Sequence, residues 1–212
     1  MDFKKKKILI TAGPTWVPID EVRVISNIAS GKTGLLLARQ AKKLGADVTL
    51  LMGPTENTII NNCIKVKPFK YFDDFKETFT REINKNYSVL IHSAAVSDYQ
   101  PKKSSSGKIK SDFKRLSLDL ILTPKLADRV KKINSKIFLV LFKLELNVPK
   151  AALIARAFKL LKATEADLVV ANTFKGNNYN AYIVDRDKKI IGQAKNKNQL
   201  TKLLLKRIDE RL

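Results

Sequence analysis

The stretch that decides the fold runs from Ile8 to Gly34 and reads ILITAGPTWVPIDEVRVISNIASGKTG. A short apolar strand leads into a long polar loop, which ends in the glycine-containing segment 30–34. The segment LLLARQAKKLG follows with apolar residues at helical spacing, and its Gly45 is suited to end a helix. A strand, a glycine-containing loop and a helix N-terminus together offer N–H groups and a positive dipole end to an anion. The stretch therefore predicts an anion-binding α/β unit.

Two common phosphate-binding motifs do not match this loop. A P-loop has a glycine five residues before its Gly-Lys-Ser/Thr segment. Gly31-Lys32-Thr33 supplies that end, but Ser26 occupies the position of the first glycine. The dinucleotide fingerprint needs G-x-G-x-x-G directly after the strand, where Gly13 stands alone. We therefore expect an anion-binding loop of a third kind.

Composition indicates a soluble protein with one compact domain over residues 1–212. The chain is 44% hydrophobic and 29% charged, and no apolar stretch approaches the ~20 residues of a membrane span. The first residues are too short an apolar run for a signal peptide. The single cysteine, Cys63, excludes an internal disulfide and favours a reducing, cytoplasmic location. Cys63 and the only histidine, His92, are expected to pack in or near the core.

The formal net charge of +21 has three interpretations. The first is a lysine-rich surface, because the basic residues are scattered through nearly every segment. The second is attraction of highly anionic small substrates. The third, nucleic-acid binding, ranks last because aromatic residues are only 8% of the chain and the arginines are not clustered among them.

Strands alternate with helices along the chain, which predicts a right-handed, mainly parallel sheet of a Rossmann-like three-layer α/β fold. The residues 100–111 are polar, lysine-rich and glycine-containing, and predict a flap. Strands are expected at 6–11, 46–53, 63–69, 88–99, 116–122, 136–142 and 166–172, helices at 32–44, 71–86, 123–133, 149–162 and 198–211, a loop at 55–63 and a C-terminal β-hairpin at 181–192. Thr123 is expected to cap the helix that Pro124 begins.

The opening stretch resembles that of phosphopantothenoylcysteine synthetases, also called phosphopantothenate–cysteine ligases. Their opening reads TAGPT, PID-x-VR, ISN and SGK-x-G, and this chain has all four segments in order between Thr11 and Gly34. Further matches extend over nearly the whole chain: AAVSDY at 94–99, KIK at 108–110, LDLILTPKLAD at 118–128, FKLE at 142–145 and DLVVAN at 167–172. The resemblance implies a stand-alone ligase, without the decarboxylase domain that precedes this unit in many relatives.

The resemblance implies a reaction of coenzyme A biosynthesis in two steps. The carboxylate of 4′-phosphopantothenate attacks the α-phosphate of a nucleoside triphosphate, usually CTP in prokaryotes, and pyrophosphate leaves. The amine of cysteine then attacks the acyl-nucleotide (acyl-cytidylate) and releases the nucleoside monophosphate. The substrates supply the reacting groups, so the protein must contribute positioning and cationic charge. The resemblance also implies Mg²⁺ and a homodimer, with no specific nucleic acid and no membrane as partner.

Asn27 and Lys108 are the catalytic candidates. The family's matching asparagine binds the acyl-nucleotide, and an amide can donate to an acyl oxygen without adding charge. The alternative role of Asn27 is to cap the following helix, which is the commoner role of a loop asparagine. The matching flap lysine helps to form the intermediate, while the alternative for Lys108 is one solvated lysine among many; Lys110 is the neighbouring candidate.

The remaining candidates are assigned to binding. Asp98 follows a strand at the carboxyl edge of the sheet and is expected to contact nucleotide or Mg²⁺, or else to be a turn residue. Phe142 is expected to contact the base, unless it is a buried strand residue. Arg23 is the further candidate for substrate binding beside Asn27. The nucleotide-binding set is Gly13, Ser30, Gly31, Lys32, Asp98, Lys108, Phe142, Lys159 and Lys162.

The chain departs from the family pattern in several places. Trp16, the pair Ile28-Ala29 and the segment 146–148 differ from the usual residues, which affects details of the substrate loops. FKLE also occurs in relatives that use ATP, so ATP remains an alternative to CTP. A NAD(P)-dependent reductase is a weaker alternative, because the dinucleotide glycines are missing and Tyr99 and Lys103 lie in a lysine-rich loop. A non-enzymatic nucleic-acid-binding protein is the other competitor.

Overall fold

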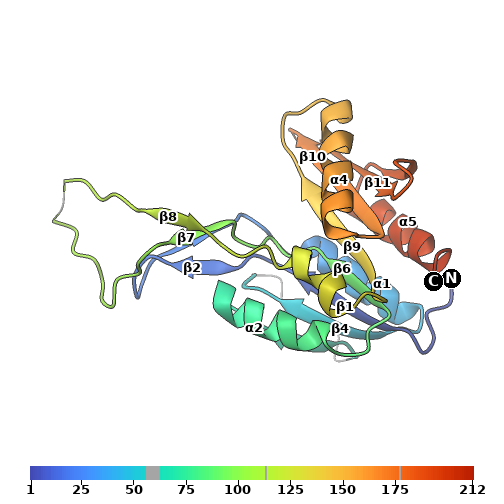
Figure 1. Ribbon diagram of the computed structural model, residues 1–212, viewed down its shortest axis with the longest axis horizontal. Helices are drawn as coiled ribbons and strands as arrows, with labels where there is room; N and C mark the ends of the chain where they lie inside the picture. The colour runs from blue at the N-terminus through green and yellow to red at the C-terminus, as the bar shows by residue number, and fades with distance from the viewer. Residues whose placement is uncertain (56–62, 113, 177) are drawn as a thin grey trace.

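The computed structural model describes residues 1–55, 63–112, 114–176 and 178–212. It consists of a sheet covered by helices on both faces and a long arm that projects away from the sheet (Figure 1). The main sheet has eight strands in the order β12-β11-β10-β9-β6-β1-β4-β5. The strands from β10 to β5 run parallel, and β11 and β12 are added antiparallel at one edge. The expected mainly parallel α/β fold with a C-terminal hairpin is confirmed.

The elements have the following bounds. The strands of the main sheet are β1 (Lys7–Ala12), β4 (Asp47–Met52), β5 (Lys65–Pro68), β6 (Val89–His92), β9 (Phe138–Leu144), β10 (Leu168–Lys175), β11 (Asn178–Asp185) and β12 (Ile190–Ala194). The helices are α1 (Lys32–Lys43), α2 (Phe72–Ile83), the 3₁₀ turn η1 (Ala127–Arg129), α3 (Val130–Ile133), α4 (Lys150–Thr164) and α5 (Lys197–Asp209). The arm contains β2 (Trp16–Pro18), β3 (Val24–Ser26), β7 (Tyr99–Pro101) and β8 (Leu120–Leu122).

Alternating side chains of the strands divide the core into two layers. In β1, Ile8 and Ile10 pack on the face covered by α1 and α5, while Leu9 packs on the face covered by α2, α3 and α4. All three side chains are fully buried. A central strand that is apolar on both sides suits a parallel sheet sandwiched by helices. The parallel arrangement also brings the carboxyl ends of β1, β6, β9 and β10 to one edge.

Several expected boundaries are wrong. The strand predicted at 116–122 is limited to Leu120–Leu122, and the strand predicted to end at Asn172 continues to Lys175. Helical structure begins at Ala127 rather than at Pro124, because Thr123 does not cap it. The Thr123 hydroxyl instead donates to the carbonyl oxygen of Ser97 at 2.6 Å. Residues 56–62 of the predicted loop 55–63 lie outside the described residues.

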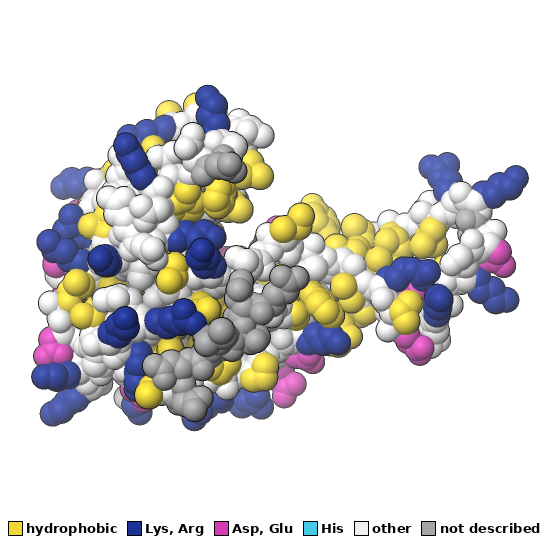
Figure 2. All heavy atoms as spheres, turned by 180° about the vertical axis from the view of Figure 1, so that it is seen from behind, with side chains coloured by type: hydrophobic (Ala, Val, Ile, Leu, Met, Phe, Trp, Pro, Cys, Tyr) yellow, Lys and Arg dark blue, Asp and Glu magenta, His cyan; other side chains and the backbone are white. Residues whose placement is uncertain are grey.

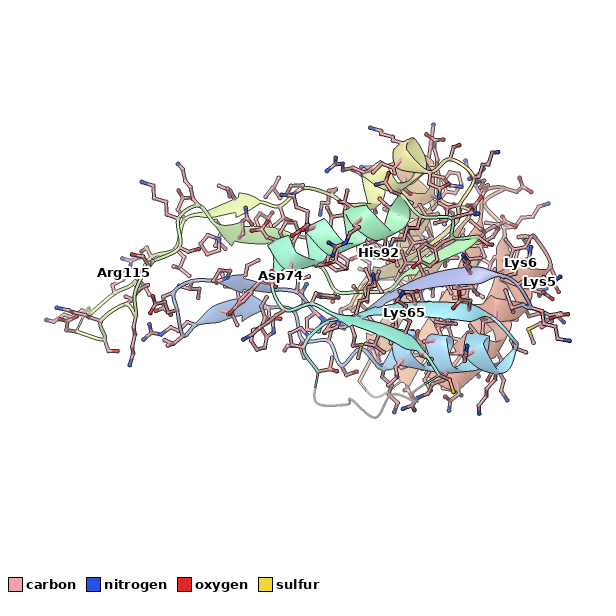
Figure 3. The ribbon with its side chains drawn as sticks, turned by 90° about the horizontal axis from the view of Figure 1, so that it is seen from below. Lys5, Lys6, Lys65, Asp74, His92 and Arg115 are labelled. Atoms are coloured by element: carbon pink, nitrogen blue, oxygen red, sulfur yellow. The ribbon has the colours of Figure 1, made fainter. Side chains whose placement is uncertain are left out.

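The arm is built from two antiparallel ribbons, β2–β3 and β7–β8. The segment 102–119 joins β7 to β8 at its far end, where Arg115 lies well away from His92 in the body (Figure 3). Lysines and arginines gather at this tip (Figure 2): Lys102, Lys103, Lys108, Lys110, Lys114 and Arg115 are all exposed. The predicted flap is therefore the end of a structured arm. None of the helices in the described ranges is long and apolar enough to cross a membrane.

Candidate active site

The principal cavity lies at the carboxyl ends of the parallel strands and has a volume of about 640 Å³. Figure 2 shows the surface hollowed between the base of the arm and the part of the body that carries α4 and β10. Residues from the loop before α1, the loop after β6, the segment 123–128 and the ends of β9 and β10 line it. Seven of the predicted site residues are among them: Gly13, Asn27, Ser30, Gly31, Lys32, Asp98 and Phe142. The cavity therefore lies at the carboxyl edge of the sheet, where the sequence analysis placed Asp98.

Glycines let the loop before α1 lie against the end of the sheet. Gly13 and Gly31 have positive φ angles of 80° and 66°. A Cβ on Gly31 would lie 2.8 Å from the Met52 side chain and 3.3 Å from the backbone nitrogen of Gly13. Gly31 is also the N-cap of α1 and supplies no side-chain cap. The first N–H groups of α1 therefore meet the cavity with little local competition, apart from a long contact of 3.5 Å between Lys32 N and Ser30 Oγ.

Asn27 is not the cap of α1. Its Nδ2 donates to the carbonyl oxygens of Ala95 and Val96, each at 3.2 Å. The alternative capping role is therefore wrong, and the side chain instead ties its loop to the segment after β6. Both amide hydrogens are used in these contacts, so Oδ1 is the atom that this side chain has left for a ligand.

Hydroxyl groups hold the segment after β6 in place. The Thr15 hydroxyl accepts from Ser97 N at 2.9 Å, and the Ser97 hydroxyl donates to the carbonyl oxygen of Thr15 at 3.2 Å. Thr15, Ser97 and Thr123 are all buried. Asp98 follows directly, is exposed and forms an ion pair with Lys125. The Asp98 carboxylate thus sits on a rigid support at the cavity rim.

His92 lies in the body behind α2 (Figure 3). Its ring stacks on Phe75 with centroids 6.0 Å apart, and its Nδ1 is 2.7 Å from the Thr11 hydroxyl. That hydroxyl also accepts from Ala94 N, so it links the ring to the segment after β6. Burial lowers the pKa of His92 to about 4, which keeps it neutral at neutral pH. The prediction that His92 packs near the core is confirmed, whereas Cys63 is exposed and that prediction is wrong.

The sequence interpretation missed several polar residues of the cavity. Lys125, Lys143, Lys197 and Asn172 also line it. Lys197 begins α5, and its pKa is lowered by burial and by the nearby charge of Lys32. Two cations held near each other in one cavity favour an anionic ligand. The Oδ1 atom of Asn172 is buried without a partner among the described residues. The sequence signal for Asn172 was its position as the last residue of the DLVVAN motif and of the predicted strand 166–172.

Four predicted residues are not among those that line the cavity. Arg23 and Lys108 belong to the arm, where Arg23 forms an ion pair with Asp20. Lys159 and Lys162 are exposed on α4, and Lys162 borders a separate cavity of about 230 Å³. The roles of all four remain predictions.

The resemblance implies a magnesium ion, which binds oxygen ligands such as carboxylates. Among the described residues no group of three or more potential metal-ligating side chains exists. Asp98 and Asp128 both line the cavity. Mg²⁺ is commonly held by one or two carboxylates together with substrate phosphates. The residues present therefore fit a magnesium ion that arrives with a nucleotide.

Residues 3–212 match the family model described as DNA/pantothenate metabolism flavoprotein C-terminal domain. The chain belongs to this family. The coenzyme A biosynthesis bifunctional protein CoaBC of Thermococcus kodakarensis is 40% identical over 172 residues, which are 80% of this chain and 42% of that protein. The protein of the same name from Borreliella burgdorferi is 35% identical over 190 residues, 87% of this chain and 47% of the relative. The family domain thus spans less than half the length of these two curated relatives.

Solved structures of the family have the same fold. The DNA/pantothenate metabolism flavoprotein from Streptococcus pneumoniae superposes with a TM-score of 0.88 at 28% identity, covering 98% of this chain and 100% of that one. A Cab2 H337A mutant in complex with phosphopantothenate-cysteine gives a TM-score of 0.81 at 20% identity, over 97% of this chain and 87% of that one. At 20% identity, the similarity to the Cab2 mutant shows a shared fold alone.

Proposed function

We propose that this chain is a phosphopantothenate–cysteine ligase of coenzyme A biosynthesis. It activates 4′-phosphopantothenate with a nucleoside triphosphate and joins the acyl-nucleotide to cysteine, with CTP cleaved to CMP and pyrophosphate. The carrying observation is the cavity of about 640 Å³, which combines a glycine-lined helix N-terminus with lysines from several elements. Family membership and the relatives named for coenzyme A biosynthesis support the same reaction.

The lysines of the cavity match the charge that this chemistry develops. Lys32 and Lys197 come from the N-termini of α1 and α5, and Lys143 comes from β9. Preorganised cations and N–H groups stabilise the negative charge that builds on a triphosphate. The substrates bring both nucleophiles, so a protein nucleophile is unnecessary. In keeping with this, the Ser93 hydroxyl is committed to the carbonyl oxygen of Thr11 at 2.6 Å.

We assign the predicted residues to the two steps as follows. Lys108 assists formation of the acyl-nucleotide, and Asn27 orients the intermediate for attack by cysteine. Asn27 Oδ1 is an acceptor, which suits an N–H group of the incoming amine. Phe142 would lie against the nucleotide. Asp98 and Asp128 would hold the magnesium ion, which would neutralise phosphate charge.

We further propose that the enzyme is a homodimer in which the arm makes the contact. Leu120, Ile121 and Leu122 are consecutive on β8 and each at least 41% exposed. Tyr99 and Val22 add further exposed apolar surface on the same arm. A two-stranded ribbon of this kind is marginally stable alone, and burial of its apolar side chains by a partner would stabilise it. A second copy also provides a way for arm residues such as Lys108 to reach a cavity.

Pyrophosphate release tests the function directly. The purified chain is supplied with Mg²⁺ and CTP or ATP, with and without phosphopantothenate and cysteine. We expect release that requires phosphopantothenate, product that requires cysteine, and a higher kcat/KM with CTP. A higher kcat/KM with ATP would reverse the nucleotide assignment alone. No phosphopantothenate-dependent release with either nucleotide would refute the proposal, and binding of NAD(P) would favour the reductase alternative.

A further inference from the structure

A buried carboxylate joins the loop between β2 and β3 to the outer segment 102–119 of the arm. Asp20 lies in the loop between β2 and β3, and none of its side-chain surface is exposed. One of its oxygens, Oδ1, accepts from the backbone nitrogens of Val22 at 2.9 Å and Arg23 at 2.7 Å. These two bonds close the local turn.

The other oxygen binds a segment far away in the sequence. Asp20 Oδ2 accepts from Ile109 N at 3.0 Å and forms an ion pair with the Arg23 guanidinium. Arg23 Nη1 in turn donates to the carbonyl oxygen of Ile109 at 3.2 Å. Both backbone polar groups of Ile109 are thus held by one acid–base pair. Lys108 and Lys110, which flank Ile109, are exposed.

The carboxylate remains charged in this position. Burial by itself would raise the pKa of Asp20, but hydrogen bonds from Val22, Ile109 and Arg23 outweigh it and lower the pKa to about 2. A buried carboxylate is tolerated when its partners are complete and becomes costly when one is removed. The hydrogen bond from Ile109 N therefore helps to offset the cost of burying the Asp20 carboxylate.

Other contacts of the segment are separate from this pair. Ser105 N donates to the carbonyl oxygen of Ile19 at 3.0 Å, and the Ser104 hydroxyl donates to that of Pro18 at 3.1 Å. These two bonds hold the residues before Gly107. Ile109, which follows Gly107, is held by Asp20 and Arg23. Closing the turn needs only Oδ1, so the engagement of Oδ2 requires a second explanation.

We infer that Asp20 is a positioning residue which, through Ile109 and together with Arg23, fixes the segment Lys108-Ile109-Lys110 for contact with anionic substrates. Its catalytic consequence rests on the proposed function, whereas its effect on the segment rests on the hydrogen bonds alone. Two lysines with a fixed backbone between them lose less freedom when they meet a phosphate than lysines on a loose loop.

The substitution Asp20→Asn separates the two oxygens. Asparagine keeps one oxygen for the turn but presents an NH₂ group to Ile109 N–H and to Arg23, which are both donors. Hydrogen exchange of the Ile109 amide should accelerate roughly tenfold or more, the size expected for losing a bond to a charged acceptor. Exchange of the Ser105 amide should change little. Glu21→Gln makes the same charge change at the adjacent exposed position and is the matched control.

Kinetics provide the second readout. In Asp20→Asn, kcat for pyrophosphate release should fall roughly tenfold, while KM for the nucleotide changes less than twofold because Asp20 does not line the cavity. Ile109→Pro removes the N–H that Oδ2 accepts without altering Asp20, and should reduce kcat in the same way. If circular dichroism shows that Asp20→Asn has not folded, the kcat of Ile109→Pro decides whether the bond between Asp20 and Ile109 matters for activity.

The outcomes distinguish this inference from the proposed function. Unchanged exchange at Ile109 in folded Asp20→Asn would overturn it, as would a wild-type kcat in both variants of an active enzyme. If the wild-type chain released no pyrophosphate, the proposed function would fail, and exchange at Ile109 would then decide whether Asp20 fixes the segment.

Discussion

Asn27 joins two loops at the rim of the cavity through a single side chain. Its amide spans the carbonyl oxygens of Ala95 and Val96, so the loop before α1 and the segment after β6 are positioned together. His92 lies under the same segment, linked to it through the Thr11 hydroxyl that accepts from Ala94 N. These two side chains set the geometry of the cavity rim.

Asn27→Asp should separate the two chemical steps. The variant loses the two donors and places a carboxylate against two carbonyl oxygens, while the N-terminus of α1 stays unchanged. We expect pyrophosphate release to persist while phosphopantothenoylcysteine fails to form, so that acyl-nucleotide accumulates and is detected by mass after rapid quenching. Asn84→Asp, which loses a similar bond to the Thr80 carbonyl oxygen outside the cavity, is the control. Normal turnover of Asn27→Asp would remove Asn27 from the mechanism.

His92 should make stability depend on pH between about 4 and 6.5. Its folded pKa of about 4 lies below the ordinary value of 6.5, so the unfolded chain binds the proton more tightly. Stability is therefore complete above pH 6.5 and is lost as pH falls through this window. We expect the free energy of unfolding in urea to drop by about 2 kcal/mol between pH 7 and pH 5.

His92→Gln serves as the control for this titration, because the chain has no other histidine. The carboxylates with lowered pKa values, Asp20, Glu82, Glu145 and Glu210, have ordinary pKa values of 3.8 or 4.5, so their contribution to stability changes mainly below pH 5. An equal drop in stability in the glutamine variant would assign the effect to other groups.

The packing of α1 against β1 decides where the N-terminus of the helix lies. Its N-terminus faces the cavity because Gly34, in its first turn, lies against β1 and the residue after β6. A Cβ at Gly34 would lie 2.5 Å from the Ala12 Cβ and 2.8 Å from the Ser93 hydroxyl. Both distances are shorter than side chains tolerate, so the helix must move if this glycine is replaced.

Gly34→Ala should destabilise the fold and weaken nucleotide binding together. Overpacking of this kind costs about 1–3 kcal/mol, and the shift moves the helix N-terminus away from its ligand. Thermal unfolding and nucleotide titration measure the two effects. Gly107→Ala is the matched control, since a Cβ there meets no heavy atom within 4 Å. A Gly34→Ala variant with unchanged melting temperature and affinity would contradict this view of α1.

The whole molecule divides into a covered sheet and an uncovered arm. The body buries its apolar side chains in two layers, whereas the arm leaves apolar side chains exposed on β8 and collects basic residues at its tip. The net charge of +21 is spread over both parts. This arrangement favours a second copy of the chain at the apolar ribbon and anionic substrates at the basic sites.

Leu122→Lys should convert a dimer to a monomer. The side chain is 65% exposed, so the substitution leaves the body intact but places a charge in the proposed contact. We expect sedimentation velocity to show a dimer for the wild type and a monomer, or at least a tenfold higher dissociation constant, for the variant. Leu212→Lys, at the exposed C-terminus opposite the arm (Figure 1), should remain dimeric. A monomeric wild type at micromolar concentration would refute the homodimer.

Local patterns determined the main elements of the fold. Apolar runs predicted the central strands, and helical spacing predicted α1, α2 and α4, because burial of one face imposes this period. The motif segments that follow parallel strands lie together at one edge of the sheet, since parallel strands end on the same side. The segments 18–23 and 108–110 lie on the arm instead. The predictions failed where a boundary depends on a partner distant in sequence, as when the Thr123 hydroxyl binds Ser97 instead of capping a helix.

Only the tertiary structure decided which side chains share the cavity and which are committed elsewhere. Lys197 and Asn172 line it from distant elements, while Lys159 and Lys162 are exposed on α4 and do not line it. The order of strands and helices and the position of the glycine-containing loop before α1 followed from the sequence, because periodicity and glycine placement are local properties. The pairing of Asp20 with Ile109 joins residues 89 positions apart. Such contacts depend on how the arm folds back on itself, which no local pattern encodes.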